Sequence, residues 1–151
     1  SRNLRFVMGE QVLGAPIVEK MGIEAIPMGY VVFAPGGKVG AVGEANLIES
    51  DDIEGAVAYA LAAKMLGFKM VYLEAGSGVN QPVDSQIIQA VRAAVPELVL
   101  IVGGGMRTGE QAQASARSGA DWIVTGNLTE EYDDASELEN VMRKYIQTMR
   151  E

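Results

Sequence analysis

Short apolar runs alternate along this chain with longer segments in which apolar residues recur every three or four positions. The first run is interrupted by glycine and proline. The later three are continuous and rich in β-branched residues, which is typical of parallel strands buried on both faces. The four strands predicted in this way span residues 25–34, 69–75, 98–102 and 122–125.

Amphipathic segments between these runs predict helices. The clearest begins at Asp51, which lies three residues before Glu54 as in a capping box. Its predicted apolar stripe consists of Ile53, Val57, Leu61 and Met65. Another helix is expected over residues 10–21, a further one after Pro82 around Ile87, Ile88 and Val91, and a third behind a cap formed by Thr108 and Gln111. The last predicted helix begins at about Ser136. The apolar residues that share one of its faces are Leu138, Val141, Met142, Tyr145, Ile146 and Met149.

Three predicted helices end in the same manner, with a glycine shortly before the next strand. These glycines are Gly22, Gly67 and Gly119, and glycine tolerates the left-handed conformation that closes a helix. Repeated strand–helix units of this kind predict an α/β fold with a parallel sheet, open or closed. Residues 36–48 break the pattern, and their glycine-rich alternation predicts a hairpin or a long loop.

Composition narrows the classes of protein that fit. A chain of 151 residues with 48% apolar residues can build one domain with a core. The net charge of −8 opposes a nucleic-acid partner, which would need clustered lysine and arginine. No apolar run approaches the roughly 20 residues of a membrane helix, and no signal peptide is recognisable, so a cytoplasmic location is expected.

The chain contains neither cysteine nor histidine. This excludes disulfides, thiolate nucleophiles, histidine-based triads and typical zinc sites. A general base would have to be a carboxylate, a lysine or a tyrosine, and a bound metal would need oxygen ligands, as magnesium or calcium does.

Three predicted strands open into glycine-rich loops that precede helices. The loops comprise residues 74–78, 103–108 and 126–127. Loops that follow parallel strands share one rim of the sheet, and their backbone N–H groups can approach an anion closely. Together the three loops predict a phosphate cradle, although a glycine after any one strand is often only a turn.

Tyr72 and Glu74 are two residues apart and therefore share one face of their strand. An acidic side chain beside a phosphate cradle could accept a hydrogen bond or a proton from a substrate hydroxyl; the alternative is a solvated glutamate at a strand end. Arg107 is interpreted as a surface residue and Trp122 as a packing residue. The Asp51–Asp52 and Asp133–Asp134 pairs are explained by helix capping without a metal.

At these loops the sequence resembles the geranylgeranylglyceryl phosphate synthase family and its bacterial heptaprenyl relatives. The similarity extends over nearly the whole chain, and the Tyr-x-Glu-x-Gly-Ser-Gly stretch is its most specific part. The matching stretches are residues 72–78 (YLEAGSG), 101–107 (IVGGGMR), 123–127 (IVTGN), 11–16 (QVLGAP) and 26–30 (IPMGY).

The resemblance implies a (β/α)8 TIM-barrel type of fold and prenyl transfer from geranylgeranyl diphosphate to the C3 hydroxyl of sn-glycerol 1-phosphate in ether-lipid synthesis. Glu74 would accept the proton of the attacking hydroxyl, Tyr72 would contact the glycerol, and the glycines with Ser77 and Asn127 would hold the phosphate. The implied substrate-binding set is Tyr72, Leu73, Glu74, Ala75, Gly76, Ser77, Gly78, Gly103, Gly104, Gly126 and Asn127.

The resemblance also implies Mg2+, bound by an aspartate of the first barrel strand. The first four strands would precede Ser1, so no metal ligand is expected in this chain, and residues 1–151 would form the C-terminal part of one barrel domain. An isolated chain of this length is expected to be inactive, because a barrel needs about 250 residues. A homo-oligomer is expected. The alternatives are another phosphate-binding barrel enzyme, such as a sugar-phosphate isomerase or lyase, and an inactive half-barrel that self-associates.

Overall fold

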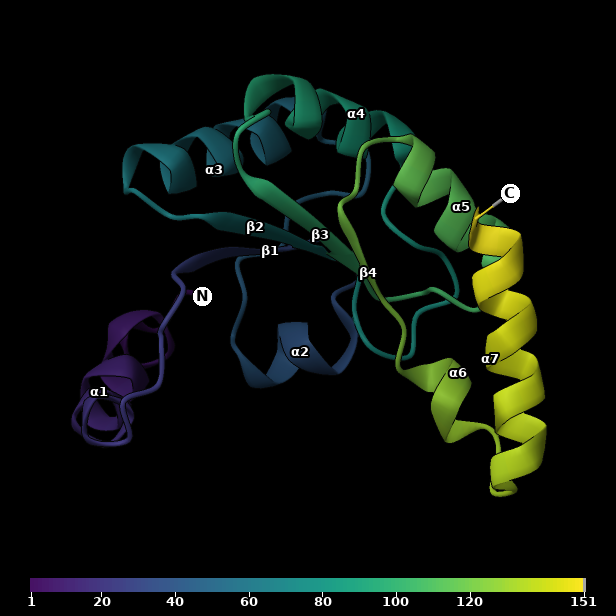
Figure 1. Ribbon diagram of the computed structural model, residues 1–151. Helices are drawn as coiled ribbons and strands as arrows, with labels where there is room; N and C mark the ends of the chain where they lie inside the picture. The colour runs from purple at the N-terminus through teal and green to yellow at the C-terminus, as the bar shows by residue number, and fades with distance from the viewer. Residues whose placement is uncertain (151) are drawn as a thin grey trace.

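The structure is a computed structural model that describes residues 1–150. Its centre is a sheet of four parallel strands, arranged in the order β1-β2-β3-β4 (Figure 1). The predicted α/β fold with a parallel sheet is therefore confirmed, and each observed strand is shorter than or shifted by a residue from its predicted span. The strands are β1 (Met28–Val32), β2 (Met70–Glu74), β3 (Val99–Gly103) and β4 (Trp122–Val124).

Three helices cover one face of this sheet, and among the described residues only the short α2 lies below the other (Figure 1). In Figure 1, α3, α4 and α5 lie above the strands, whereas α1 and α7 stand at the two sides. The elements other than strands are the π-helix η1 (Arg5–Gly9), α1 (Glu10–Lys20), α2 (Gly37–Val42), α3 (Ile53–Met65), α4 (Ser85–Ala94), α5 (Gly109–Arg117), α6 (Asn127–Glu130) and α7 (Ala135–Arg150).

The main core lies between the sheet and these covering helices. Val71, Leu73 and Val102 are fully buried there, and Leu100 nearly so. They alternate along β2 and β3 with residues of the other face, as the two-residue period of a strand requires. Removal of their apolar surface from water is the main contribution to the stability of this layer.

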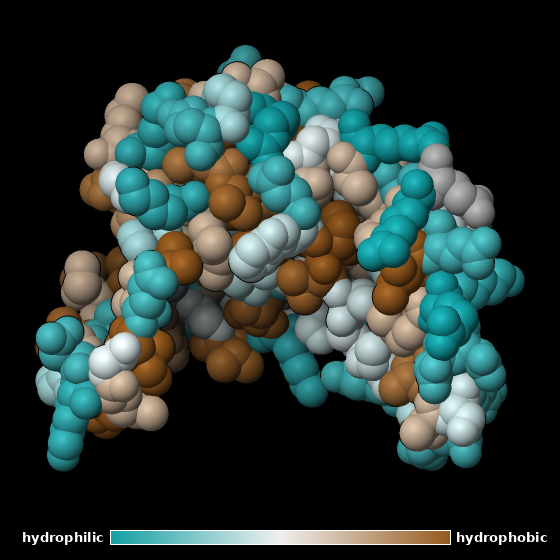
Figure 2. Space-filling model, viewed as in Figure 1, coloured by the Kyte–Doolittle hydropathy of each residue, from teal (hydrophilic) through white to brown (hydrophobic). Residues whose placement is uncertain are grey.

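The opposite face of the sheet is only partly covered by residues 1–150. Large side chains on it remain in contact with solvent, among them Tyr30, Trp122 and Val124. Helices α1 and α7 form two side arms that project on either side of the sheet (Figure 1). Figure 2 shows hydrophobic surface gathered on the underside of the sheet, between these two arms. Contiguous exposed apolar faces of this kind are typical of surfaces that contact another protein, a membrane or a ligand.

Helix α3 packs differently from its sequence prediction. Asp52, not Asp51, caps the helix, because its side chain accepts a hydrogen bond from the Gly55 N–H. Small residues of the helix lie against the sheet, whereas Met65 of the predicted stripe is 82% exposed. The predicted stripe is therefore wrong in part; Val57 and Leu61 flank the core, and the buried residues are Ala56, Ala60 and Ala63.

The alanine contact of α3 gives a stability prediction. Ala60 is completely buried, so Ala60→Leu would force extra methylene groups into a packed interface and should lower the free energy of unfolding by about 1–3 kcal/mol. Met65→Leu is the control, with an expected change within about 0.5 kcal/mol. Urea unfolding of both variants measures this. Equal effects of the two substitutions would mean that α3 buries the stripe predicted from the sequence.

Residues 36–48 form no hairpin. They contain the short helix α2 and return to the outer edge of β1, where Phe33 and Ile48 form a single parallel bridge. Of the two predicted alternatives the hairpin is therefore wrong, because Gly36 and Gly37 have positive φ values and turn the chain into a helix. The alternative of a long connection holds, with α2 inside it. The glycines predicted to end helices are confirmed, with φ values of 64° at Gly22, 81° at Gly67 and 114° at Gly119.

The two side arms differ in how well they are packed. Helix α7 packs on α5 through Tyr145, which is buried with Ala112 and Leu128, whereas Ile146 of its predicted apolar face is 38% exposed. Helix α1 buries none of its residues, and it lies apart from the sheet in Figure 1. No helix formed by residues 1–150 combines the length and apolar character needed to cross a membrane.

Candidate functional site

The three glycine-rich loops predicted to share a rim do lie together at the carboxyl ends of β2, β3 and β4. The Gly78 N–H donates a 3.0 Å hydrogen bond to Asn127 Oδ1, which joins the first loop to the third. A methyl group placed on Gly104 would lie 2.5 Å from Gly76 N, so the first and second loops are in direct contact. The loops therefore form one continuous glycine-lined surface.

A fourth glycine loop belongs to the same rim. Gly36 and Gly37, which follow β1, pack backbone against backbone on Gly76 and Ser77; a methyl group on Gly76 would lie 2.5 Å from the Gly36 carbonyl carbon. Sequence reasoning missed this loop because residues 36–48 were interpreted as one irregular segment. The available signal was a pair of glycines two and three residues after a predicted strand, similar to the glycines that follow the other three strands.

Glu74 lies at the centre of this rim, at the end of β2. Its side chain is buried although it is ionisable. The Gly76 N–H donates to Oε1 at 2.6 Å, and the Tyr30 hydroxyl donates to Oε2 at 2.7 Å. A buried carboxylate is stable only when such donors replace water. The alternative of a solvated glutamate is therefore wrong for this structure.

Two tyrosines flank the carboxylate. Tyr30 and Tyr72 are paired in the parallel register of β1 and β2, and their rings stack with centroids 4.7 Å apart. Burial, followed by the negative charge and hydrogen bonding of Glu74, raises the pKa of both phenols far above the usual value. Both hydroxyls therefore remain protonated at neutral pH and act as hydrogen-bond donors.

The remaining predicted site residues are placed in three different ways. Leu73 and Ala75 point to the helix-covered face and are buried in the main core, so only their backbone atoms reach the rim. Gly103 lies beneath Tyr72, because a methyl group there would overlap the Tyr72 hydroxyl. The exposed members of the predicted set are Ser77, Gly78 and Gly126.

Comparison with protein families identifies the chain. Residues 1–148 match the model of the PcrB family. The chain belongs to the PcrB family. The geranylgeranylglyceryl phosphate synthase of Methanothrix thermoacetophila is 50% identical over 134 residues, which are 89% of this chain and 52% of that enzyme. The synthase of Methanothermobacter marburgensis is 46% identical over 149 residues, which are 99% of this chain and 59% of that enzyme.

A solved structure of this family superimposes on nearly the whole chain. It is the (S)-3-O-geranylgeranylglyceryl phosphate synthase of Thermoplasma acidophilum in complex with sn-glycerol-1-phosphate. The TM-score is 0.92 at 42% identity, covering 99% of this chain and 59% of the other. The predicted relationship and TIM-barrel type are confirmed, with this chain as a partial barrel. The chain spans little more than half the length of these relatives.

Arg107 and the paired aspartates of this PcrB family chain have structural partners. Arg107 forms an ion pair with Glu131 at 2.7 Å. Its side chain is only partly exposed and its Nε is buried, so the surface interpretation holds in part. Asp134 accepts hydrogen bonds from the N–H groups of Ser136 and Glu137 at the start of α7. Capping therefore explains Asp134 as it explains Asp52, without a metal.

The rim offers a poor set of ligands for a divalent cation. Residues 1–150 bring no three aspartates or glutamates together. Glu74 is the buried carboxylate of the rim, and each of its oxygens already accepts a hydrogen bond. The residues of this chain therefore do not fit a magnesium site on their own.

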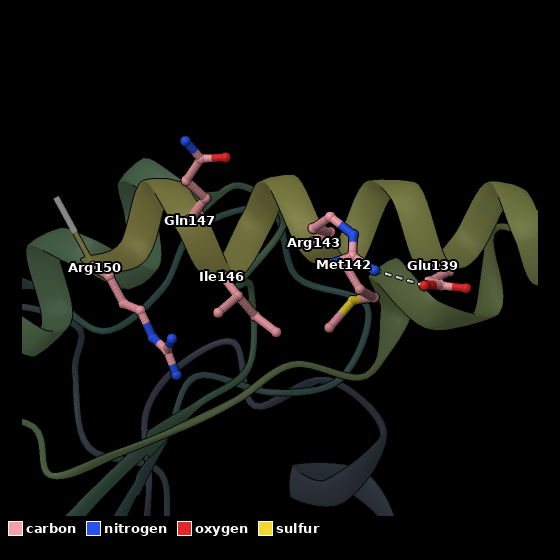
Figure 3. A pocket seen from close by; sticks show the side chains of 6 residues that line it. All are labelled: Glu139, Met142, Arg143, Ile146, Gln147 and Arg150. Carbon is pink, nitrogen blue, oxygen red and sulfur yellow. Dashed lines mark hydrogen bonds and ion pairs between the residues drawn. The ribbon is translucent and has the colours of Figure 1, made fainter.

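A separate hollow of about 770 Å³ lies along α7, away from the glycine-lined rim. Figure 3 shows Met142, Ile146 and Arg150 pointing away from α7 toward the same side, while Arg143 pairs with Glu139. All the lining residues belong to this one helix: Glu139, Met142, Arg143, Ile146, Gln147 and Arg150. The hollow is an uncovered helix face and does not provide the converging polar groups of a ligand site.

Proposed function

We propose that this chain provides the glycerol-phosphate half of a prenyltransferase. The reaction transfers a geranylgeranyl or similar long prenyl group from a prenyl diphosphate to the C3 hydroxyl of sn-glycerol 1-phosphate, in ether-lipid synthesis. The observation that carries this proposal is a buried, doubly hydrogen-bonded Glu74 carboxylate at the centre of a glycine-lined rim. The names of the family relatives support it, as does the glycerol-phosphate complex of the Thermoplasma acidophilum enzyme.

The rim residues have distinct roles in this proposal. Backbone N–H groups of the glycine-rich loops, among them that of Gly104, bind the phosphate together with the Ser77 hydroxyl, because glycines allow an anion to approach the backbone. The Gly76 N–H is engaged by Glu74 Oε1. Asn127 fixes the loop after β2 through the Gly78 N–H. Holding the phosphate in this way places the glycerol hydroxyl for attack and removes much of the entropic barrier.

Glu74 and Tyr72 act on the glycerol. The C3 oxygen forms a bond to C1 of the prenyl group while the bond from C1 to the diphosphate oxygen breaks, and diphosphate leaves with the electron pair. The hydroxyl proton passes to the Glu74 carboxylate, which lies beside the Tyr72 ring on the same strand face. Tyr72 contacts the glycerol through its hydroxyl, whose oxygen can accept a hydrogen bond from the substrate while its O–H faces Glu74.

We further propose that a segment outside residues 1–151 completes the barrel. Within residues 1–150, β1 and β4 are edge strands with one strand neighbour each, and unpaired strand edges invite pairing. The same segment would also cover three exposed apolar surfaces: the open face of the sheet, helix α1, and the hollow along α7. The relatives are long enough to supply four more strands. We expect Mg2+ ligands in that segment, a cytoplasmic location and a homo-oligomer.

The completion proposal predicts that residues 1–151 alone have no prenyltransferase activity. Fusion to the part of the Methanothrix thermoacetophila synthase that this chain does not span should restore Mg2+-dependent transfer from geranylgeranyl diphosphate, because the fusion closes the sheet. A radiolabel extraction assay with sn-glycerol 1-phosphate measures the product. Transfer by the isolated chain would contradict the proposed completion.

Two controls separate the competing functions. Ribose 5-phosphate offered to the fusion in place of sn-glycerol 1-phosphate should give no prenylated product, and tighter binding of the sugar phosphate would favour an isomerase or lyase. Native mass spectrometry of the isolated chain tests self-association. A stable dimer of twice 16.0 kDa, together with an inactive fusion, would favour the self-associating half-barrel.

A further inference from the structure

Tyr30 occupies a place beside the site that its sequence context does not reveal. It lies on β1, one strand away from the Tyr-x-Glu stretch, and the parallel register sets it directly opposite Tyr72. Its hydroxyl donates a 2.7 Å hydrogen bond to Glu74 Oε2. The sequence separation between donor and acceptor is 44 residues, so only the sheet brings them together.

The hydrogen bond from Tyr30 restricts the rotation of the Glu74 carboxylate. A glutamate side chain has three rotatable bonds, and one hydrogen bond leaves the carboxylate free to turn about its last bond. Here the Gly76 N–H holds Oε1 and the Tyr30 hydroxyl holds Oε2. Two donors from different elements therefore define both the position and the plane of the carboxylate.

We infer that Tyr30 is a positioning residue that acts through Glu74, holding its carboxylate plane toward the glycerol hydroxyl without binding the substrate itself. This inference rests on the proposed function, in which Glu74 accepts the proton of that hydroxyl. Each carboxylate oxygen has further lone-pair capacity for a substrate hydroxyl after accepting one hydrogen bond. Stacking on Tyr72 keeps the Tyr30 ring from turning away.

The environment of Tyr30 suits this role. Burial and the neighbouring Glu74 raise the pKa of the Tyr30 hydroxyl, so it remains a donor throughout the pH range in which enzymes of this kind are assayed. Tyr72 is the second phenol that faces the same carboxylate, and its pKa is raised for the same reasons. The carboxylate thus keeps its donor at any neutral pH.

The functional test uses Tyr30→Phe in the active fusion protein. We expect kcat to fall about 10- to 100-fold, the loss typical of a reacting group displaced by about 1 Å, while KM for sn-glycerol 1-phosphate changes less than about threefold. The matched control is Tyr59→Phe, because Tyr59 is also a half-exposed tyrosine but its hydroxyl contacts only Asn46 among the hydrogen bonds of this structure. This control should leave kcat and KM unchanged.

A double-mutant cycle distinguishes failure of this inference from failure of the proposed function. If Tyr30 acts through Glu74, adding Tyr30→Phe to Glu74→Gln should lower kcat by less than about threefold, since coupled residues are not additive. Full additivity would overturn the positioning role. An unchanged kcat in Glu74→Gln alone would overturn the proposed role of Glu74 instead.

A second measurement does not depend on activity. In residues 1–151 with 13C-labelled glutamate carboxyl groups, the Glu74 resonance is assigned by its loss in Glu74→Gln. Tyr30→Phe should move that resonance, and Tyr59→Phe should not. An unmoved Glu74 resonance in Tyr30→Phe would show that the phenol does not hold the carboxylate and would overturn the inference.

Discussion

Replacing Glu74 with glutamine in the active fusion protein is expected to lower prenyl transfer by about 100- to 10,000-fold, the range for loss of a positioned general base. Glutamine has the same shape, so Oε1 can still accept from the Gly76 N–H. It cannot take a proton from the glycerol hydroxyl at neutral pH. The affinity for sn-glycerol 1-phosphate should therefore fall by no more than about tenfold. Steady-state kinetics and isothermal titration measure the two effects.

Glu97→Gln provides the matched control for this substitution. Glu97 pairs with Lys64 on the surface before β3, at the opposite end of the sheet from the rim. Removal of its charge should leave both transfer and binding unchanged, since exposed ion pairs contribute little. Unchanged turnover in Glu74→Gln would mean that Glu74 is not the base, and a loss of binding without loss of kcat would assign it to substrate recognition alone.

Gly104→Ala is expected to damage both the binding site and the packing of the rim. Gly104 has a φ value of 80°, and a methyl group there would overlap Glu74 Oε1 and lie 2.5 Å from Gly76 N. It would occupy the space of the hydrogen bond that joins these two groups. We expect a loss of sn-glycerol 1-phosphate affinity greater than about tenfold, together with a lower free energy of unfolding.

Gly67→Ala separates the two causes of this loss. Gly67 has nearly the same φ value, 81°, but a methyl group there meets nothing within 4 Å. Both substitutions carry the left-handed strain of about 1–3 kcal/mol. Only Gly104→Ala adds a clash, which should lower the free energy of unfolding by about a further 1–3 kcal/mol. Equal urea midpoints and equal affinities in the two variants would contradict the tight packing of the rim.

The order of strands and helices could be read from the sequence because local rules govern it. Continuous apolar runs marked β2 and β3, glycine marked the helix ends, and Thr108 with Gln111 formed the predicted capping box of α5. The errors arose where the local pattern was ambiguous. Helix α3 contains apolar residues on all sides, so its sequence could not tell that alanines would face the sheet.

The site was predicted in part for the same reason. Alternation along one strand placed Tyr72 and Glu74 on a common face without knowledge of the fold. No local pattern connects Tyr30 with Glu74, because the contact depends on the register of two strands. The contact between the Gly36–Gly37 loop and Gly76 is equally non-local, since close approach of two backbones is decided by how the strand ends converge.

The sequence by itself thus determined the α/β class, the succession of elements, the family and the strand face that carries Glu74. These features follow from periodicity, from the conformational freedom of glycine, and from motifs that occupy consecutive positions. Only the tertiary structure decided that four glycine loops meet and that Tyr30 and Gly76 together hold the Glu74 carboxylate. These contacts join residues on different strands and loops, and the parallel register and sheet twist that bring them together are properties of the packed sheet.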